Sequence, residues 1–495
     1  MQELNLIAAA PEIVLLAATC LVLMVDLFVP DDKRYLTLSL TLTVLALTAG
    51  VTWIFLANDV VMYAFDGLYV TDPMASVLKL FAVLVTALVL IYSQGYALDR
   101  GMWKGELFTL SLFSLLGMFV MISANNLLVV YLGLELQSLS LYALVALRRD
   151  DGRATEAAMK YFVLGALASG FLLYGMSMLY GASGTLDINE LARRVAVGEV
   201  ASRAALVLGT VFLVAGLAFK FGVVPFHMWV PDVYEGAPTP VTMFISSAPK
   251  LAAFAITYRM LVEGLLPLAV DWQQMIALIA VASLILGNLA AIAQTNLKRM
   301  LAYSTIAQMG FMLLALVGPI TGGQPMNATL DFSAAMFYVI TYSLTTLGTF
   351  GMILLMARQG HEAEEISDLA GLNQRSPWYA LVMLMLMFSL AGIPPTVGFY
   401  AKFVVLEALL AGGGTGPVVL AVIAVMASLI GAFYYLRIVK LMYFDAPAAG
   451  VPQLAASTDL RVLLSINGAL VLVLGLFPQY LLQLCTDAMV RSLGG

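Results

Sequence analysis

The stretch LAFKFGVVPFHMWVPDVYEGAPTPVTMFISSAPKLAAFAIT, residues 217–257, places two lysines, Lys220 and Lys250, inside sequence that is apolar enough to cross a bilayer. A transmembrane helix needs about 20 predominantly apolar residues, and a charge at its centre costs from roughly 2.5–3.5 kcal/mol on insertion scales to several times that in simulations. Charged residues at this depth are typical of ion and proton paths. The stretch therefore predicts a membrane protein with a polar route through its core.

A proline interrupts this sequence between the two lysines. Pro225 removes one helical hydrogen bond and clashes with the preceding turn, so a break is expected between Phe221 and Pro225. Lys220 precedes an interfacial Pro231 by eleven residues, about 16 Å at 1.5 Å per residue, which places Lys220 near the bilayer midplane. His227 follows Lys220 at i+7, on the same helical face, and is a candidate proton relay.

Two further apolar runs carry an ionisable residue. Glu135 lies in NLLVVYLGLELQSLSLYALVAL, residues 126–147, among polar side chains that share one helical face. Lys402 follows a GIPPT motif, in which Pro394 and Pro395 predict a second helix break. Interrupted helices in corresponding positions of two halves are typical of inverted-repeat transporters.

The composition indicates a polytopic membrane protein. Hydrophobic residues make up 62% of the 495 residues and charged residues only 11%, and the loops between apolar runs are too short for a soluble domain. Two cysteines and two histidines cannot form an iron–sulfur, haem or zinc ligand set, so we expect no redox cofactor in this chain. The net charge of −6 is dispersed and no basic arm or patch appears, which disfavours nucleic acid as a partner, whereas the apolar composition makes the lipid bilayer the expected surroundings.

The sequence predicts an all-α fold of about fourteen transmembrane helices, centred near residues 20, 46, 84, 115, 137, 169, 218, 251, 284, 310, 345, 392, 430 and 472. The first run is expected to stay as a helix, because no small-residue cleavage site precedes Asp26. Most lysines and arginines fall in loops after odd-numbered spans, which places those loops in the cytoplasm. Both termini are therefore expected on the noncytoplasmic, periplasmic side.

We predict a single membrane domain over residues 1–495 that has four parts. These are three N-terminal spans (1–105), a five-helix repeat of spans four to eight (106–265), an inverted repeat of spans nine to thirteen (266–445), and the last span with the tail (446–495). Each repeat contains one broken helix, and an odd number of spans per repeat gives the two copies opposite orientations. The side chains predicted to line a wire of water in the second repeat are Ser304, Gln308, Thr341 and Thr345.

Other charged side chains receive structural interpretations. Lys79 lies about six residues past Pro73, near enough to the interface for its stem to snorkel. Arg259 and Glu263, near a helix end, are interpreted as interfacial anchors. For Glu135, a static ion pair with a lysine stays open beside a role in proton transfer.

Several motifs resemble one known family. They are KFGVVPFHMWVPDVYEGAPTPVT (220–242), SSAPK (246–250), LKRMLAYSTIAQMGFMLLAL (297–316) and GIPPTVGFYAKF (392–403). These motifs are similar to the antiporter-like membrane subunits of the proton-pumping NADH-quinone oxidoreductase, respiratory complex I. Within that family, YLGLELQSLSLYALVALRRD (131–150) and AAMKYFVLGALASG (157–170) look like the N-type subunits, the bacterial counterpart of mitochondrial subunit 2. The M-type usually has a glutamate in place of Lys402, and the L-type has a long lateral helix for which no sequence follows Arg491.

The resemblance implies roles for particular residues and for the chain. Glu135, Lys220, Lys250 and Lys402 stand where the family has its proton-translocating residues, and His227 matches a histidine of the family motif. It further implies a subunit in the bacterial inner membrane, among other membrane subunits of complex I that include the other antiporter-like ones. NADH, FMN, the iron–sulfur clusters and quinone are then handled by other subunits.

Three hypotheses follow for the function. In the leading one, a proton passes from Glu135 and Lys220 to Lys250 and then to Lys402, driven by quinone reduction elsewhere; the order of steps is inferred from the resemblance. The second is a multisubunit cation/proton antiporter, although sodium favours carboxylates and carbonyls over lysines. The third is an assembly scaffold, in which Lys402→Ala leaves the pumping stoichiometry unchanged while loss of the chain destroys the complex.

Overall fold

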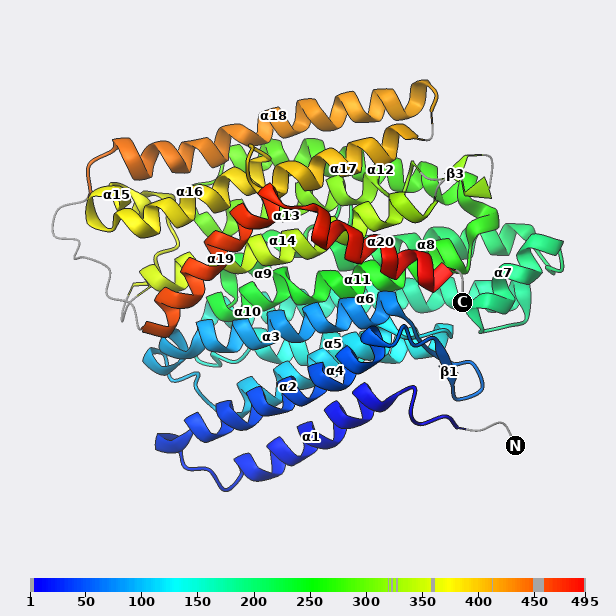
Figure 1. Ribbon diagram of the computed structural model, residues 1–495, viewed down its shortest axis with the longest axis horizontal. Coiled ribbons are helices and arrows are strands. Elements are labelled where there is room, and N and C mark those ends of the chain that lie inside the picture. The colour runs from blue at the N-terminus through cyan, green and yellow to red at the C-terminus, as the bar shows by residue number, and fades with distance from the viewer. Residues whose placement is uncertain are drawn as a thin grey trace.

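The computed structural model describes residues 4–318, 320–321, 324–325, 328–357, 361–411, 413–447 and 458–493. In this part of the chain nearly all regular structure is helical, and most of the helices lie side by side along one direction (Figure 1). Two antiparallel hairpins, β1 with β2 and β3 with β4, are the sheets of the described residues. Eleven helices there are long and apolar enough to cross a membrane. The predicted all-α polytopic membrane fold is confirmed.

The elements follow the colour ramp of Figure 1 from the N-terminus to the C-terminus. The first are α1 (Ala10–Asp26), η1 (Asp31–Lys33), α2 (Tyr35–Ala57), β1 (Met62–Ala64), β2 (Tyr69–Thr71), α3 (Pro73–Asp99), α4 (Gly105–Ile122), α5 (Leu127–Val145), α6 (Gly152–Ser183) and α7 (Ile188–Val197). Next come α8 (Arg203–Phe221), α9 (Trp229–Gly236), α10 (Thr239–Ser246), α11 (Ala248–Thr257), the π-helix η2 (Tyr258–Glu263), η3 (Leu266–Leu268), α12 (Ala269–Ile292) and α13 (Leu297–Leu314). The last are β3 (Ile320–Thr321), β4 (Gln324–Pro325), α14 (Ala328–Met356), η4 (Ile366–Leu369), α15 (Leu372–Arg375), α16 (Pro377–Ala391), α17 (Val397–Ala411), α18 (Thr415–Phe444), α19 (Thr458–Leu476) and α20 (Gln479–Leu493).

Each of the fourteen predicted span centres falls in a helix or at a helix break. Eleven of the corresponding segments have the length and hydropathy of a membrane span. The remaining three are α1, α13 and the α16–α17 pair, so fourteen stays our predicted number. The short helices α7 and α20 were not anticipated from the sequence.

Contacts between loops show which loops share an end of the helical bundle. Glu362 accepts hydrogen bonds from Arg100 at 3.0 Å and from Arg148 at 3.2 Å, and Lys298 donates to Glu364 at 2.8 Å. Burial alone raises the pKa of Glu362, but the hydrogen bonds from Tyr96 and Arg100 together with the positive charges of Arg100 and Arg148 hold that pKa below its usual value. The loops after spans three, five, nine and eleven therefore meet at one end. Both termini lie at the opposite end (Figure 1), as the predicted alternation of loops requires.

The two halves of the chain share a packing pattern in opposite orientations. Before α5, Asn126 forms an isolated antiparallel bridge with Asp187, and before α13, Asn296 forms the same bridge with Glu365. The first bridge lies at the end of the bundle that carries the termini, and the second lies beside Glu364 at the other end. Inverted repeats would produce this recurrence, and both the repeats and their boundaries stay a prediction.

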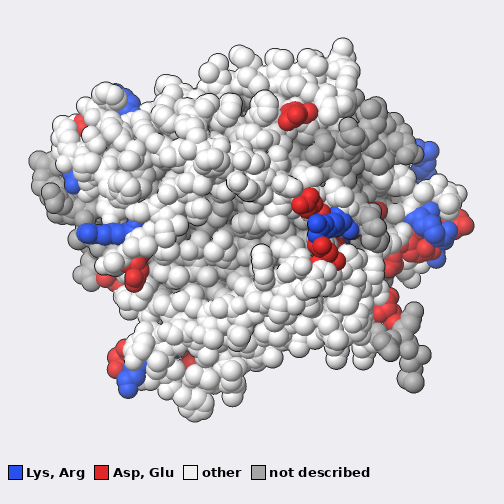
Figure 2. Space-filling model, viewed as in Figure 1, with Lys and Arg blue, Asp and Glu red and all other residues white. Residues whose placement is uncertain are grey.

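Charged side chains lie mainly toward the two ends of the bundle, and a broad band with few Lys, Arg, Asp or Glu side chains separates them on the face in Figure 2. The helices differ in depth within the bundle. The hydrophobic windows of α14 and of the α10–η2 segment are 100% buried, whereas those of α18 and α19 are 22% buried. The helix that carries Lys250 is therefore at the core of the molecule, and the outer helices are available to lipid or to other subunits.

Candidate functional site

Two helices are broken in the same way near the middle of the bundle. α8 ends at Gly222 (φ 74°) and α16 at Gly392 (φ 82°), both left-handed caps that favour glycine. The Gly222 N–H donates to the Ala218 carbonyl at 3.0 Å, and the Gly392 N–H to the Phe388 carbonyl at 2.9 Å. The chain resumes as α9 and α17, so the predicted breaks at Pro225 and at Pro394–Pro395 are observed.

A broken helix leaves its last carbonyl groups without intrahelical partners, and a lysine fills that role at each break. Lys250 Nζ donates to the carbonyls of Lys220 at 3.1 Å and Phe221 at 2.9 Å. Lys402 Nζ donates to the carbonyls of Leu390 at 3.1 Å and Ala391 at 3.0 Å. Each ammonium group therefore faces the negative end of a helix dipole.

An aromatic ring lies beside each of these ammonium groups. Lys250 Nζ is 5.5 Å from the centroid of the Trp229 ring, and Lys402 Nζ is 5.5 Å from that of Phe311. A cation at a helix C-terminus gains about 0.3–2 kcal/mol, and a cation–π contact adds about 0.5–2 kcal/mol. These gains are of the same order as the lower estimates for inserting a lysine into a bilayer, which explains how the charges are tolerated.

Lys220 lies next to these groups but does not pair with Glu135. Lys220 Nζ donates to Ser138 Oγ at 2.7 Å, and no ion pair joins Lys220 to Glu135 in the described structure. One carboxylate oxygen of Glu135 is buried and has no hydrogen-bond partner there. On α5, Glu135 lies between the exposed Leu132 and Leu139, toward the outer surface. The charge of Glu135 therefore acts on Lys220, as expected, but the static ion pair that the sequence left open is absent from the described structure.

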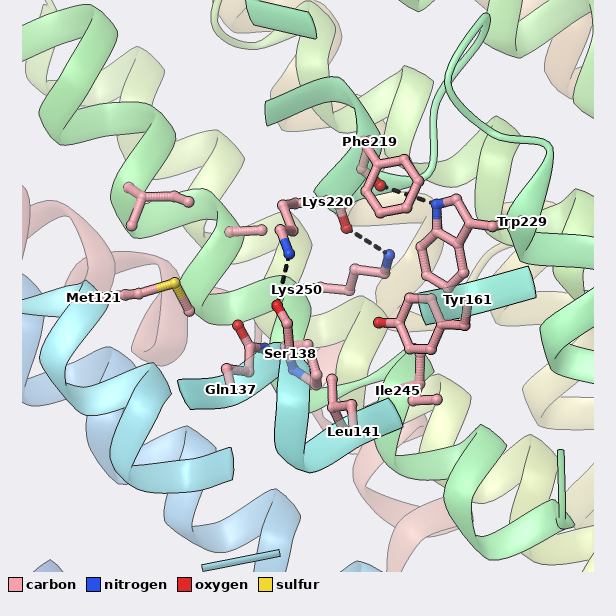
Figure 3. A pocket seen from close by; sticks show the side chains of 13 residues that line it. Met121, Gln137, Ser138, Leu141, Tyr161, Phe219, Lys220, Trp229, Ile245 and Lys250 are labelled. Carbon is pink, nitrogen blue, oxygen red and sulfur yellow. Dashed lines mark hydrogen bonds between the residues drawn. The ribbon is translucent and has the colours of Figure 1, made fainter. Parts of the chain in front are cut away.

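A cavity of about 20 Å³, room for about one water molecule, lies between Lys220 and Lys250 (Figure 3). Its walls include Ser138, Tyr161 and Trp229. Figure 3 shows the Lys250 ammonium reaching the Lys220 carbonyl, while the Lys220 ammonium points to Ser138 on the other side. A water in this cavity lies within reach of both lysines.

His227 does not share a helical face with Lys220, because the helix ends first. It lies in the turn between α8 and α9, and its Nδ1 is buried with no hydrogen-bond partner among the described residues. The expected i+7 relation fails because Gly222 reverses the backbone before His227 is reached. A second departure concerns the Lys250 helix, which is interrupted at Ser247 and ends in a π-helix.

A second cavity of about 20 Å³ lies in the other half, where Leu390 and Ala401 line it near the α16–α17 break. Gln308, Thr341 and Thr345, three residues predicted to line a water wire, line this cavity. Gln308 Nε2 donates to the Leu390 carbonyl at 2.8 Å, the same oxygen that accepts from Lys402. The cavity is therefore connected to the Lys402 ammonium by one shared acceptor.

Ser304 does not line this cavity but belongs to a hydrogen-bonded group with Tyr435 and Gln308. Its hydroxyl bonds to Tyr435, whose oxygen also accepts from Gln308 Nε2 at 3.1 Å. Ser428 accepts from Lys402 Nζ at 2.8 Å. Ser428 and Tyr435 were missed, although their i, i+7 spacing in an otherwise apolar span is a signal of a shared polar face.

The snorkelling interpretation of Lys79 is wrong. Its side chain is 1% exposed and lies 2.6 Å from a carboxylate oxygen of Glu12. The presence of Glu12 in the first apolar run was the sequence signal for this pair. Among the described residues, no group of three or more His, Cys, Asp or Glu side chains could hold a metal ion.

These broken helices with lysines on their ends define an antiporter-like membrane subunit. Residues 124–431 match the family model described as NADH:quinone oxidoreductase/Mrp antiporter, TM. Among solved structures, the fold superposes on a chain of the Mrp complex from Dietzia sp. DQ12-45-1b with a TM-score of 0.83 at 22% identity, covering 99% of this chain and 96% of that one. At that identity the likeness shows the fold alone.

Relatives that match nearly the full length of the chain identify its family. It is 59% identical to NADH-quinone oxidoreductase subunit N of Polaromonas naphthalenivorans (strain CJ2), covering 99% of both chains. It also superposes, with a TM-score of 0.80 at 32% identity, on a chain of respiratory complex I from Thermus thermophilus with bound aureothin, covering 96% of this chain and 99% of that one. The chain belongs to the NADH-quinone oxidoreductase subunit N family.

Proposed function

We propose that this chain is a proton-translocating membrane subunit of an NADH-quinone oxidoreductase. The observation that carries the proposal is the pair of lysines, Lys250 and Lys402, each of whose ammonium groups is held on the open carbonyls of a broken helix. NADH oxidation, FMN, the iron–sulfur clusters and quinone reduction belong to other subunits of the complex. This chain supplies a path for protons that those reactions drive.

The geometry supports a sequence of proton-holding groups. Glu135 and Ser138 both lie on α5, and Ser138 accepts a hydrogen bond from the Lys220 ammonium group. The first cavity joins Lys220 to Lys250, and the second cavity leads to Lys402 through Gln308. Burial disfavours the ammonium form of each lysine, whereas the helix-end carbonyls stabilise it. A small displacement of a helix end from its lysine therefore favours release of the proton.

The chain's place in the membrane is part of the proposal. The excess of lysine and arginine at the end that carries Arg100 and Arg148 supports a cytoplasmic position for that end, with both termini on the periplasmic side of the bacterial inner membrane. The partners are the other membrane subunits of the complex, including the other antiporter-like ones, and lipid. Lysines as the exchanging groups favour protons over sodium, which prefers oxygen ligands.

The test is proton pumping measured together with NADH-quinone turnover in membranes carrying Lys220→Ala or Lys250→Ala, with assembly verified independently. Lys440→Ala is the matched control, because Lys440 is 67% exposed. We expect both activities to fall in the buried-lysine variants while the complex stays assembled. Wild-type turnover and pumping in both variants would contradict the proposal and favour the scaffold hypothesis.

A further inference from the structure

A second group of buried charges lies near the β1–β2 hairpin, at the end of the bundle that carries the termini. We call it the hairpin charge cluster, and its charged members are Glu12, Asp72, Lys79, Arg259 and Glu263. Their side chains are between 1% and 17% exposed. None of them belongs to the path through Lys250 and Lys402 described above.

One part of the cluster joins α1, β2, α3 and α4. Lys79 Nζ lies 2.6 Å from Glu12 Oε1 and donates to Tyr69 Oη at 2.9 Å and to Ser123 Oγ at 2.6 Å. Tyr69 in turn donates to Glu12 Oε2 at 2.5 Å. Glu12 therefore has the Lys79 ammonium beside one carboxylate oxygen and the Tyr69 hydroxyl on the other.

The other part is centred on Arg259, in the π-helix that follows α11. Arg259 donates to Asp72 Oδ2 at 2.7 Å and to the Ile122 carbonyl at 2.7 Å. Both oxygens of Glu263 contact one Arg259 nitrogen at 3.2 Å. Asp72 also accepts the Ala75 N–H at 2.7 Å, so Glu263 is the carboxylate with the weakest stabilisation.

The charges of the cluster do not balance. Three carboxylates, Glu12, Asp72 and Glu263, face two cations, Lys79 and Arg259, which leaves one excess negative charge when all five are ionised. An uncompensated buried charge costs several kcal/mol, so in proteins such a group takes up a proton instead. Glu263 is the group that takes it, because its contacts with Arg259 are the longest in the cluster.

Two members of the hairpin charge cluster, Arg259 and Glu263, lie on the same helical segment as Lys250, further toward its C-terminal end. Glu263 is 13 residues beyond Lys250 on the continuous α11–η2 segment, at most about 20 Å at the α-helical rise of 1.5 Å per residue, because the wider π-helix η2 rises less. Between them, the fully buried Tyr258 has a hydroxyl with no hydrogen-bond partner in the described structure, and this residue interacts electrostatically with Glu263, Arg259 and Asp72. The Lys250 cavity is also lined by Met121, the residue before the Ile122 whose carbonyl binds Arg259.

We propose that Glu263 is a proton-holding site of the first half, which exchanges protons between the Lys250 cavity and the periplasmic end of the bundle. This inference rests on the proposed function. The carboxyl O–H forms when a proton arrives from the Lys250 side and breaks when it leaves, with no change in oxidation state. The 17% exposure of the Glu263 side chain gives it access to the bundle surface, so the first half has an outlet that does not pass through Lys402.

Infrared difference spectroscopy on the purified, assembled complex tests the protonation directly. A buried protonated carboxyl has a C=O stretch that shifts in D2O, and this band is expected in the wild type and lost in Glu263→Gln. Glu12→Gln leaves two carboxylates and two cations, so the charge count predicts that the same band is lost although Glu263 remains. Glu190→Gln, at an ion-paired carboxylate of α7, is the control and keeps the band.

Persistence of the band in both Glu263→Gln and Glu12→Gln would overturn the inference. A band that appears only when sodium is removed would also overturn it, because the excess charge would then be neutralised by a bound cation. Pumping separates this inference from the proposed function. We expect Glu263→Gln to lower the protons pumped per NADH and Glu263→Asp to retain them. Loss of pumping in Lys250→Ala with wild-type pumping in Glu263→Gln would leave the proposed function standing and remove Glu263 from it.

Discussion

The two helix breaks share a common construction, yet they obtain their lysine from different places. At the α8–α9 break the capping lysine, Lys250, comes from α11, a different helix. At the α16–α17 break, Lys402 comes from the second piece of the same broken helix. A shift of α11 relative to α8 therefore changes the first contact, whereas the second changes only when the two pieces of its own helix move relative to each other.

The surroundings of the two breaks also differ. Lys220 lies two residues before Gly222, and the corresponding residue before Gly392 is Leu390. The first break therefore has a second lysine, with Glu135 on the neighbouring helix α5, and the second break has one lysine with neutral hydrogen-bonding neighbours. The lysine on open carbonyls is therefore the element that the two breaks share, whereas the carboxylate and the lysine pair are features of the first half.

The largest difference is expected when each capping lysine is replaced by methionine. Lys250→Met leaves the Lys220 and Phe221 carbonyls with no donor among the described residues, whereas after Lys402→Met the Leu390 carbonyl keeps Gln308. Each unsatisfied buried group costs about 1–3 kcal/mol, so Lys250→Met should lower the stability of the complex more. Thermal unfolding of the purified complex checks this. Equal melting temperatures for the two variants would show that the halves do not differ as described.

Glu135→Gln should change coupling without changing stability. One Glu135 oxygen is buried with no hydrogen-bond partner in the described structure, and no ion pair is lost on substitution, so the stability change should stay within about 0.5 kcal/mol. The protons pumped per NADH should fall, because the first half loses its proposed proton-transferring carboxylate on α5. The exposed Glu407→Gln is the control. An unchanged pumping ratio in Glu135→Gln would leave Glu135 outside the path.

The two capping glycines should respond differently to alanine. A Cβ at Gly392 would lie 2.8 Å from Lys402 Cδ, whereas a Cβ at Gly222 would lie 2.4 Å from Val230 Cγ2 and would not touch a lysine. Both variants incur the strain of a left-handed backbone, about 1–3 kcal/mol. Only Gly392→Ala should also lower pumping per NADH in the assembled complex. The same pumping loss in Gly222→Ala would indicate that helix geometry, and not lysine placement, sets the activity.

The smallest effect is expected from the serines that accept from each lysine. Ser138→Ala removes the one hydrogen bond of the Lys220 ammonium seen in the described structure, while Lys402 keeps two carbonyls after Ser428→Ala. A hydrogen bond to a charged group contributes about 1.5–3 kcal/mol, and a remaining partner reduces the net loss. Ser138→Ala should therefore slow turnover more than Ser428→Ala. The opposite order of NADH-quinone turnover rates would contradict the assignment of Ser138 to Lys220.

Much of this fold was predictable from the sequence because a bilayer imposes simple rules. The lengths of the apolar runs predicted the helices, and prolines predicted both helix breaks. The distribution of lysine and arginine predicted which loops share an end of the bundle. The acceptors of Lys250 and Lys402 could not be predicted, because they are backbone carbonyls exposed only once a helix is broken. His227 was misplaced for the same reason, since helical spacing does not continue through Gly222.

The buried partners of Lys79 were hidden from local sequence reasoning. Glu12 is 67 residues away in the chain, and only the packing of α1 against the hairpin and α3 brings the two together. The short distance of Lys79 from Pro73 correctly predicted that Lys79 lies near one end of the bundle. It could not show that protein covers Lys79 at that end. Depth in the membrane and exposure to solvent are separate quantities, and the sequence pattern gives only the first.

The most direct test of the central claim is the number of protons pumped per NADH oxidised in liposomes that contain the assembled complex with Lys250→Met and Lys402→Met together. Loss of a positioned proton-transfer group slows such a step by roughly 10²-fold or more, so we expect pumping through the subunit to stop and the ratio to fall below that of wild type and Lys440→Met. A wild-type ratio in the double variant would contradict it.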